Sequence, residues 1–213
     1  MSSSTAQDYL SQAGISGELQ EVETGNVSET HKVGEDYFLQ TSNGNPENLR
    51  RGILGLESQQ DTDIPVPEII YSDFTEPVLI TRAVPGDNIG TTNNPEVYSN
   101  AGELMAKIHE QKFDSYGLMD IQNRVLEPSD GEDWTKSFSR LYHRFMSSGS
   151  ELLDQSKAAQ IDRFYYDKMP ELVKNPEKSL AHFDFHEDNL YHQDGEITGI
   201  LDWDMLRVVD PAL

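Results

Sequence analysis

Cysteine is absent from this sequence of 213 residues, which excludes disulfide bonds and thiolate metal ligands. Long apolar runs are absent too, since no stretch approaches the roughly 18 residues of a membrane-spanning helix. Basic residues are few, with 16 Lys and Arg against 38 Asp and Glu and a formal net charge of −22. Nucleic acids and anionic membranes bind basic surfaces, so we expect neither as a partner, and we expect a cytoplasmic protein.

Helical and strand-like patterns are both present, and they follow one another along the chain. Asn45-Pro46-Glu47 and Asn94-Pro95-Glu96 each combine an N-cap residue, a proline at the first helical position and an acidic first turn. Apolar spacing then predicts helices over residues 46–59, 94–111, 133–147 and 157–169. Alternating apolar segments predict strands over residues 37–39, 68–72 and 78–84. Residues 113–131 have no regular pattern, and Pro170 is expected to end the last helix.

This order of elements predicts an α+β fold with two lobes. The first lobe combines an antiparallel sheet with one helix, and the second is mainly helical with a hairpin near its end. Pro85-Gly86 closes the strand-rich part, so the expected domains are residues 1–84 and 85–213.

That segment combines His182-Phe183-Asp184-Phe185-His186-Glu187-Asp188-Asn189 with Gly199-Ile200-Leu201-Asp202-Trp203-Asp204. Asp194-Gly195 between them is a two-residue signal for a type I′ hairpin. A regular register from that turn pairs Gln193 with Glu196, Tyr191 with Thr198 and Asn189 with Ile200. Asp202 then lies diagonal to Asn189, about 7–8 Å away by backbone. An amide oxygen and a carboxylate at that separation can share one hard cation.

These residue types suit phosphoryl transfer, which needs oxygen ligands for Mg²⁺ and a carboxylate that accepts the proton of the attacking hydroxyl. The spacing from His182 through Asp184 to Asn189, followed by Asp202, matches the catalytic loop and metal-binding Asp of protein kinases. With His186 and Asp-Trp-Asp in place of Asp-Phe-Gly, the segment resembles the aminoglycoside phosphotransferase and choline kinase-like family. The helix that contains Gly102-Glu103-Leu104-Met105-Ala106-Lys107-Ile108-His109 resembles the first helix of that family's C-terminal lobe. In that family further helices follow the Asp-Trp-Asp segment, so the resemblance implies an incomplete C-terminal lobe in this chain.

The resemblance implies an ATP- and Mg²⁺-dependent kinase that phosphorylates a hydroxyl of a small molecule such as an aminoglycoside, an amino-sugar or a choline-like compound. Asp184 is then the catalytic base, and His186, with His182, shapes its loop. Asn189 and Asp202 are the Mg²⁺ ligands. Asp204 lies at the rim, near the substrate or a second metal.

In the first lobe, the resemblance implies four nucleotide contacts and one departure. Ser28 belongs to a loop that covers the phosphates, and Thr81 and Val84 line a hinge that meets the adenine. Gln40 occupies the strand position where the family has a Lys or Arg. The helical Glu that pairs with this residue in the family falls near Gly52, so both partners are missing.

Arg50 or Arg51, one turn from the missing Glu, is a candidate to supply the missing positive charge from the helix. Loss of both partners also favours an alternative function, a noncatalytic nucleotide-binding module. A metal-dependent hydrolase is a further alternative, because His182, Asp184 and His186 alternate along an extended segment. An ordinary solvated acidic turn is the simplest interpretation of any one of these residues alone.

Acidic residues are spread along the whole chain, a pattern that indicates adaptation of the surface to high salt and a halophilic source. The same acidity means that acidic residues near the site do not identify the acceptor. The oligomeric state is also not encoded in any pattern of this sequence.

Overall fold

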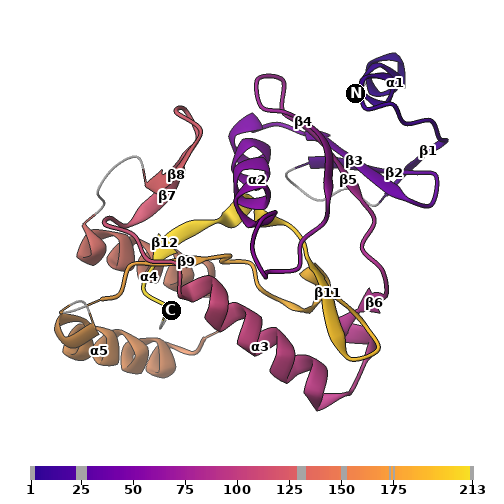
Figure 1. The fold of residues 1–213 in the computed structure, drawn as a ribbon. Coiled ribbons are helices and arrows are strands. Elements are labelled where there is room, and N and C mark those ends of the chain that lie inside the picture. The colour runs from indigo at the N-terminus through magenta and orange to yellow at the C-terminus, as the bar shows by residue number, and fades with distance from the viewer. Residues whose placement is uncertain are drawn as a thin grey trace.

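The computed structural model describes residues 3–22, 28–128, 133–149, 153–172, 174 and 176–211. The fold is mixed, with an antiparallel sheet in one lobe and most of the helices in the other, as the sequence predicts (Figure 1). No helix in the described ranges is long and apolar enough to cross a membrane.

The first lobe is a five-stranded antiparallel sheet with a helix on each side. Its strand order is β1-β2-β3-β5-β4. The strands are β1 (Leu19–Glu21), β2 (Ser28–Val33), β3 (Tyr37–Ser42), β4 (Ile69–Asp73) and β5 (Val78–Arg82), and the helices are α1 (Ser3–Gln12) and α2 (Pro46–Gln59). Helix α2 begins as predicted, because the side chain of Asn45 accepts a hydrogen bond from the amide of Glu47.

The two faces of this sheet have different functions, because side chains alternate along each strand. Leu39, Val78 and Ile80 are buried with Ala6 and Leu10 of α1 in a small core. The alternate side chains Phe38 and Gln40 of β3, with Leu79 and Thr81 of β5, point to the opposite face, toward α2 and the second lobe. That opposite face forms one wall of the candidate site.

The second lobe contains three helices and two small sheets. The helices are α3 (Pro95–His109), α4 (Trp134–Gly149) and α5 (Gln155–Leu172). One sheet has the order β11-β10-β6 and the other β8-β7-β12-β9. The strands are β6 (Asp87–Asn88), β7 (Gly117–Asp120), β8 (Val125–Pro128), β9 (Ser179–Ala181), β10 (Leu190–Gln193), β11 (Glu196–Ile200) and β12 (Arg207–Val209), and short 3₁₀ turns are η1 (Ile89–Thr91), η2 (Glu187–Asn189) and η3 (Trp203–Met205).

Helix α2 shares its core with the second lobe, although the sequence assigns it to the first. Its buried Leu49, Ile53 and Leu56 belong to the same apolar cluster as Ile200 and Trp203. In Figure 1, α2 accordingly lies between the sheet of the first lobe and the C-terminal strands. This packing brings the helix directly against the segment that carries the candidate chemistry.

Two expectations about secondary structure are wrong. Residues 113–131 were expected to be irregular, yet β7 and β8 form a hairpin within them, and β7 also pairs with the distant strand β12. Pro170 lies inside the last turn of α5, which continues to Leu172. The proline removes one hydrogen bond and crowds the carbonyl four residues earlier, but only two helical residues follow it, so the last turn tolerates this cost.

Candidate functional site

The loop after β9 has a constrained backbone that sets the direction of its polar side chains. Phe183 has a positive φ of 66°, which is unusual for a residue with a side chain. Its ring lies under the guanidinium of Arg207, with Cζ 4.1 Å from the ring centroid. The contact with β12 stabilises the turn immediately before Asp184.

Asp184, His186 and Asn189 form one hydrogen-bonded group. Nδ2 of Asn189 donates to the carbonyl oxygen of Asp184 at 2.9 Å and to its Oδ2 at 3.2 Å. Nδ1 of His186 accepts from the amide of Asp188 at 3.3 Å, and Nε2 of the same ring lies 3.5 Å from Oδ2 of Asp184 and 3.3 Å from Nδ2 of Asn189. His186 and Asn189 therefore orient the Asp184 carboxylate from two sides, and that carboxylate stays partly open to solvent.

The hairpin after this loop has the predicted turn and a different register. Asp194 and Gly195 both have positive φ, as a type I′ turn requires, and Gln193 pairs with Glu196. A bulge between Tyr191 and His192 then shifts the register, so that Tyr191 pairs with Gly199 and Leu190 with Ile200. The predicted pairs of Tyr191 with Thr198 and of Asn189 with Ile200 are wrong.

The bulge follows from a contact that the hairpin sequence does not contain. Oγ1 of Thr198 donates to the carbonyl of Pro85 at 2.6 Å, which draws this residue out of the regular ladder. The register shift moves Asn189 one position further along β11, where its carbonyl accepts from the amide of Leu201 at 2.8 Å. Asn189 therefore lies beside the residue that precedes Asp202, and the two expected metal ligands remain neighbours.

Asp202 and Asp204 occupy a tight turn that concentrates negative charge. Asp202 has a left-handed backbone (φ 58°, ψ 69°), and Asp204 is buried at 7% exposure. Burial by the surrounding protein and the charge of Asp184 raise the pKa of Asp202. The residue nevertheless keeps an exposed surface, which lines a cavity. Burial and the carboxylate of Asp202 raise the pKa of Asp204 to about 7.

His182 is a structural part of the site rather than a metal ligand. It is 2% exposed, and its Nε2 donates to the carbonyl of Leu201 at 2.8 Å. Its ring contacts that of Trp203 edge to face, with 4.7 Å between centroids. Burial lowers its pKa to about 4, so the ring is neutral near pH 7. A site in which His182, Asp184 and His186 converge on one transition metal does not form, and the described residues contain no group of three such side chains.

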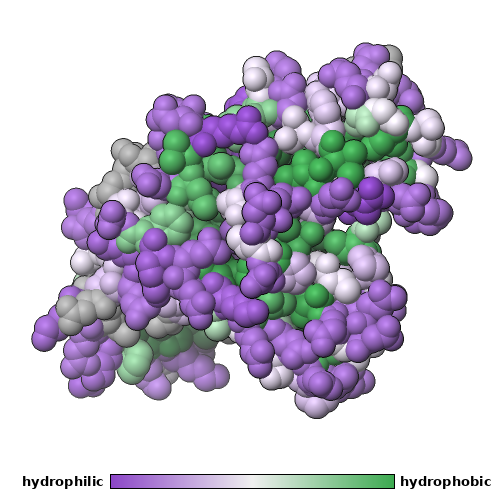
Figure 2. Space-filling model, viewed as in Figure 1, coloured by the Kyte–Doolittle hydropathy of each residue, from purple (hydrophilic) through white to green (hydrophobic). Residues whose placement is uncertain are grey.

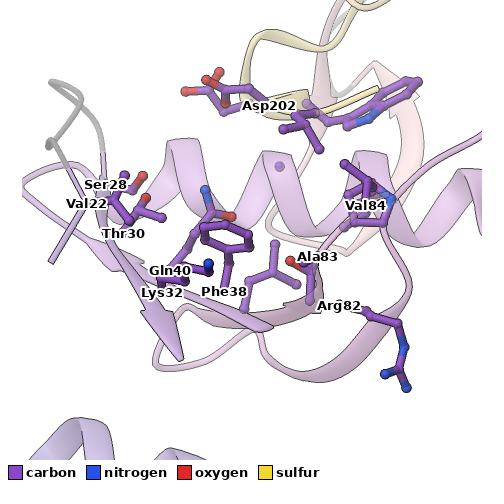
Figure 3. Close-up of a pocket in the computed structure, with 18 of the residues that line it drawn as sticks. Val22, Ser28, Thr30, Lys32, Phe38, Gln40, Arg82, Ala83, Val84 and Asp202 are labelled. Atoms are coloured by element: carbon purple, nitrogen blue, oxygen red, sulfur yellow. The ribbon is translucent and has the colours of Figure 1, made fainter. Parts of the chain in front are cut away.

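A cavity of about 450 Å³ lies between the sheet of the first lobe and the Asp202–Asp204 turn. Figure 2 shows a hollow between the lobes with hydrophobic residues along its walls. In Figure 3, Asp202 projects from one side, and Ser28, Thr30, Phe38 and Gln40 face it from the sheet. The lining includes all four expected nucleotide contacts, Ser28, Gln40, Thr81 and Val84, together with Asp202 and Asp204.

Not every expected residue lines the cavity. Asp184, His186 and Asn189 are outside its lining, although the charges of Asp184 and His186 act on Asp202. The expected phosphate loop begins at Thr24, and its residues 24–27 lie outside the described residues. Lys32 and Phe38 also line the cavity and were missed from the sequence. Alternation along the strands, counted from Ser28 and Gln40, identifies both.

The connection between the lobes packs closely against the hairpin. Gly86 has φ +94°, and a Cβ added there would lie 2.0 Å from the carbonyl oxygen of His192. A Cβ at Gly199 would lie 2.5 Å from Val84. Only glycine fits at these contacts, so the segment that contains Val84 has its position set by β10 and β11.

The two candidate arginines of α2 have different environments. Arg50 donates from Nε to the carbonyl of Phe74 at 2.9 Å and from Nη2 to that of Thr75 at 2.7 Å, on the turn between β4 and β5. Arg51 is buried and donates from Nη1 to the carbonyl of Asp204 at 3.0 Å. Only Arg51 therefore contacts the acidic turn, and Gly52 beside it also faces Asp204.

The donor set fits a hard cation that is shared with phosphate oxygens. Nδ2 of Asn189 is occupied by Asp184, which leaves Oδ1 as the free atom of this amide. Burial and the charge of Asp184 raise the pKa of both Asp202 and Asp204, and a cation would relieve the repulsion between these carboxylates. Mg²⁺ in nucleotide sites is held by one or two protein carboxylates plus phosphates, so a large protein cage is not required.

Comparisons with known proteins agree with this geometry. A model of the phosphotransferase enzyme family matches residues 24–213. No curated protein matched the sequence in a direct search. The ternary complex of aminoglycoside phosphotransferase APH(4)-Ia with AMP-PNP and hygromycin B is similar in fold, with a TM-score of 0.67, 19% identity, and coverage of 99% of this chain and 74% of that chain.

Two further structures have the same fold. The streptomycin–ATP complex of APH(2")-IIa has a TM-score of 0.66 and 15% identity, and the match covers 99% of this chain and 73% of that chain. Aminoglycoside phosphotransferase APH(2'')-Ib bound to ADP has a TM-score of 0.67 and 16% identity, with the same coverage. These similarities show a protein-kinase-like fold.

Proposed function

Because the chain belongs to the phosphotransferase enzyme family, we propose that it transfers the γ-phosphate of ATP to a hydroxyl of a small molecule in a Mg²⁺-dependent reaction. The observation that carries the proposal is the meeting of Asp184, Asn189 and Asp202 beside a cavity between the lobes. In this proposal, residues 1–84 form the nucleotide lobe and residues 85–213 the catalytic lobe.

The cavity suits a nucleotide in size and in the distribution of its polar groups. Its volume of about 450 Å³ lies within the usual range for small-molecule sites. Phe38, Leu79 and Leu201 offer apolar surface to a base. Ser28, Thr30 and Gln40 offer polar groups that would contact the phosphates. Structures of similar fold contain ATP, ADP or AMP-PNP, which supports ATP as the donor.

Asp184 is the proposed general base. Its carboxylate accepts the proton of the acceptor hydroxyl while that oxygen forms a bond to the γ-phosphorus and the bond to the leaving ADP breaks. Asn189 and His186 hold the carboxylate in one orientation through their contacts with Oδ2. Asn189 Oδ1 and Asp202 would hold Mg²⁺, which supplies charge neutralisation to the phosphates when bound.

The acceptor is proposed to be a hydroxyl compound with cationic groups. The similar structures contain streptomycin or hygromycin B as a second ligand, which supports a small-molecule acceptor. The carboxylates of Glu187 and Asp188, on the loop beside Asp184, would attract amines. Choline-like molecules and amino-sugars share this chemistry with aminoglycosides, so all three classes belong in one test.

We expect the purified protein to form ADP from MgATP only when a suitable acceptor is present. The assay couples ADP release to a panel of aminoglycosides, amino-sugars and choline, and mass spectrometry identifies a phosphorylated product. Reactions without Mg²⁺ and without acceptor are the controls. Because the surface is highly acidic, the panel is run at low and at molar KCl.

A noncatalytic nucleotide-binding module is the alternative that Gln40 and Gly52 favour. The same protein preparation distinguishes the two functions by calorimetry with MgATP. Saturable binding without phosphorylation of any acceptor would support the noncatalytic module and contradict the proposed kinase.

Replacement of Gln40 with Lys is expected to strengthen MgATP binding about tenfold. A charge-assisted hydrogen bond contributes about 1.5–3 kcal/mol, and a lysine at this cavity wall would face the phosphates without a competing helical carboxylate. Calorimetry of Gln40→Lys measures the change. Gln160→Lys adds the same charge at an exposed position of α5, outside the cavity lining, and should leave the dissociation constant unchanged.

A further inference from the structure

Arg51 is a buried cation in contact with the acidic turn. It is 8% exposed, and Nη1 donates both to the carbonyl oxygen of Asp204 at 3.0 Å and to Oδ1 of Asn48 at 3.3 Å. Burial of a guanidinium is costly unless a charge or a strong hydrogen bond compensates it. The compensation here comes from a turn that lies 153 residues away in sequence.

Two glycines bring α2 close enough for this contact. A Cβ at Gly52 would lie 3.7 Å from the backbone N and Cα of Asp204, and a Cβ at Gly55 would lie 3.0 Å from Cβ of Trp203. These glycines are three positions apart, so both face the same side of the helix. The backbone of α2 therefore packs closely against the turn, and the side chain of Arg51 lies beside this contact.

The positive charge of Arg51 is opposite to the negative charge of the turn that contains Asp202 and Asp204. A glutamate at position 52 would add a carboxylate next to Asp204, whereas the guanidinium of Arg51 places a positive charge beside this residue. Burial and Asp202 raise the pKa of Asp204, and the charge of Arg51 opposes them. Helix α2 thus carries a cation, Arg51, next to Gly52, where the family's ion pair has a glutamate.

We propose that Arg51 is a positioning residue for phosphoryl transfer, which anchors the carbonyl of Asp204 and thereby holds the left-handed Asp202 with its carboxylate toward the cavity. In this chain, the contact of Arg51 with Asp204 would replace the family's ion pair between strand and helix, whose two positions hold Gln40 and Gly52 here. The inference rests on the proposed function, because the position of Asp202 matters only if Asp202 serves a metal–nucleotide complex.

Calorimetry and turnover of matched variants test this inference. Arg51→Met keeps an apolar stem of similar length but loses the donor, and supports around a metal site typically contribute about 10–100-fold to affinity or activity. We expect MgATP affinity and kcat to fall by that factor, while binding of ATP in EDTA changes little. Arg51→Lys, which keeps the charge and one donor group, should recover part of the loss.

Arg50→Met is the matched control. Arg50 is the adjacent residue of the same helix and makes two carbonyl contacts, but these lie on the turn between β4 and β5. We expect this variant to bind MgATP as the wild type does, even if its unfolding temperature falls. A residue with only a structural function would lower the unfolding temperature without separating MgATP binding from binding of ATP alone.

If folded Arg51→Met binds MgATP and turns over like Arg50→Met, the inference is wrong and the proposed function stands. If the wild type neither binds MgATP nor phosphorylates an acceptor, the proposed function fails and the inference fails with it. If Arg51→Met does not fold, Asn48→Ala serves as the test, because it removes the amide oxygen that accepts the second hydrogen bond of the Arg51 guanidinium. An unchanged MgATP affinity in Asn48→Ala would then refute the inference, and a severalfold loss would support it.

Discussion

Asp184→Asn is expected to lower kcat by about 10²–10⁴-fold and to leave the dissociation constant of MgATP nearly unchanged. The amide keeps the size of the carboxylate but cannot accept the proton of the acceptor hydroxyl. Asp184 is outside the cavity lining, so its replacement should not disturb the nucleotide. Single-turnover kinetics with a responsive acceptor, together with calorimetry, measure the two effects separately.

Asp188→Asn is the matched control for this experiment. Asp188 lies four residues further along the same loop, its side chain is 83% exposed, and its carboxylate is 3.6 Å from Nδ1 of His186. Asp188→Asn removes the same charge without removing the proposed base, so kcat at saturating acceptor should change little, and weaker attraction of a cationic acceptor would raise KM instead. Equal losses in the two variants would show that local charge, rather than proton acceptance by Asp184, determines the rate.

The wild type is expected to lose about 3 kcal/mol of stability through His182 as the pH falls from about 6.5 to about 4. Burial lowers the pKa of His182 from 6.5 in the unfolded chain to about 4 in the folded one. Between these values the unfolded state binds more protons, so protonation favours unfolding. The contribution is therefore complete above pH 6.5 and disappears toward pH 4.

Chemical denaturation of wild type and His182→Gln at several pH values isolates this effect. Glutamine can donate to the carbonyl of Leu201 and does not titrate, so the variant should have a flatter dependence of unfolding free energy on pH. His143→Gln replaces an exposed histidine and should retain the wild-type slope. Identical slopes in wild type and His182→Gln would contradict the prediction, because carboxylate titration is common to both.

Features that depend on local sequence were predicted well. Asn45-Pro46 and Asn94-Pro95 begin α2 and α3, and Asp194-Gly195 forms the hairpin turn, because each signal acts within a few residues. The fold class was also predicted, and the similar structures confirm it. The expected phosphotransferase family is confirmed by the family model.

Features that depend on distant contacts were not predictable from sequence. The hairpin register changes because Thr198 bonds to Pro85, 113 residues earlier. The β7–β8 hairpin turns through Arg124, a non-glycine residue with φ 52°, whose guanidinium binds Glu57 and stacks on Phe74 of the first lobe. Neither contact leaves a signal in the nearby sequence, because the partners come from other elements.

The site was predicted in its residues but not in all its contacts. Asp184, Asn189 and Asp202 come together as their spacing implied, whereas the choice between Arg50 and Arg51 required the orientation of α2. Adjacent residues of a helix point about 100° apart, so only packing decides which one faces the turn. The roles of the site residues and the adaptation to high salt stay predictions.

The left-handed backbone of Asp202 has a consequence for protein engineering. A non-glycine residue in this conformation costs on the order of 1 kcal/mol or more, and glycine would adopt it freely. A selection for thermostability alone would therefore favour glycine at position 202 and remove a proposed metal ligand in the same step. Variants of this protein should accordingly be selected for stability and activity together, since at this residue the two requirements oppose each other.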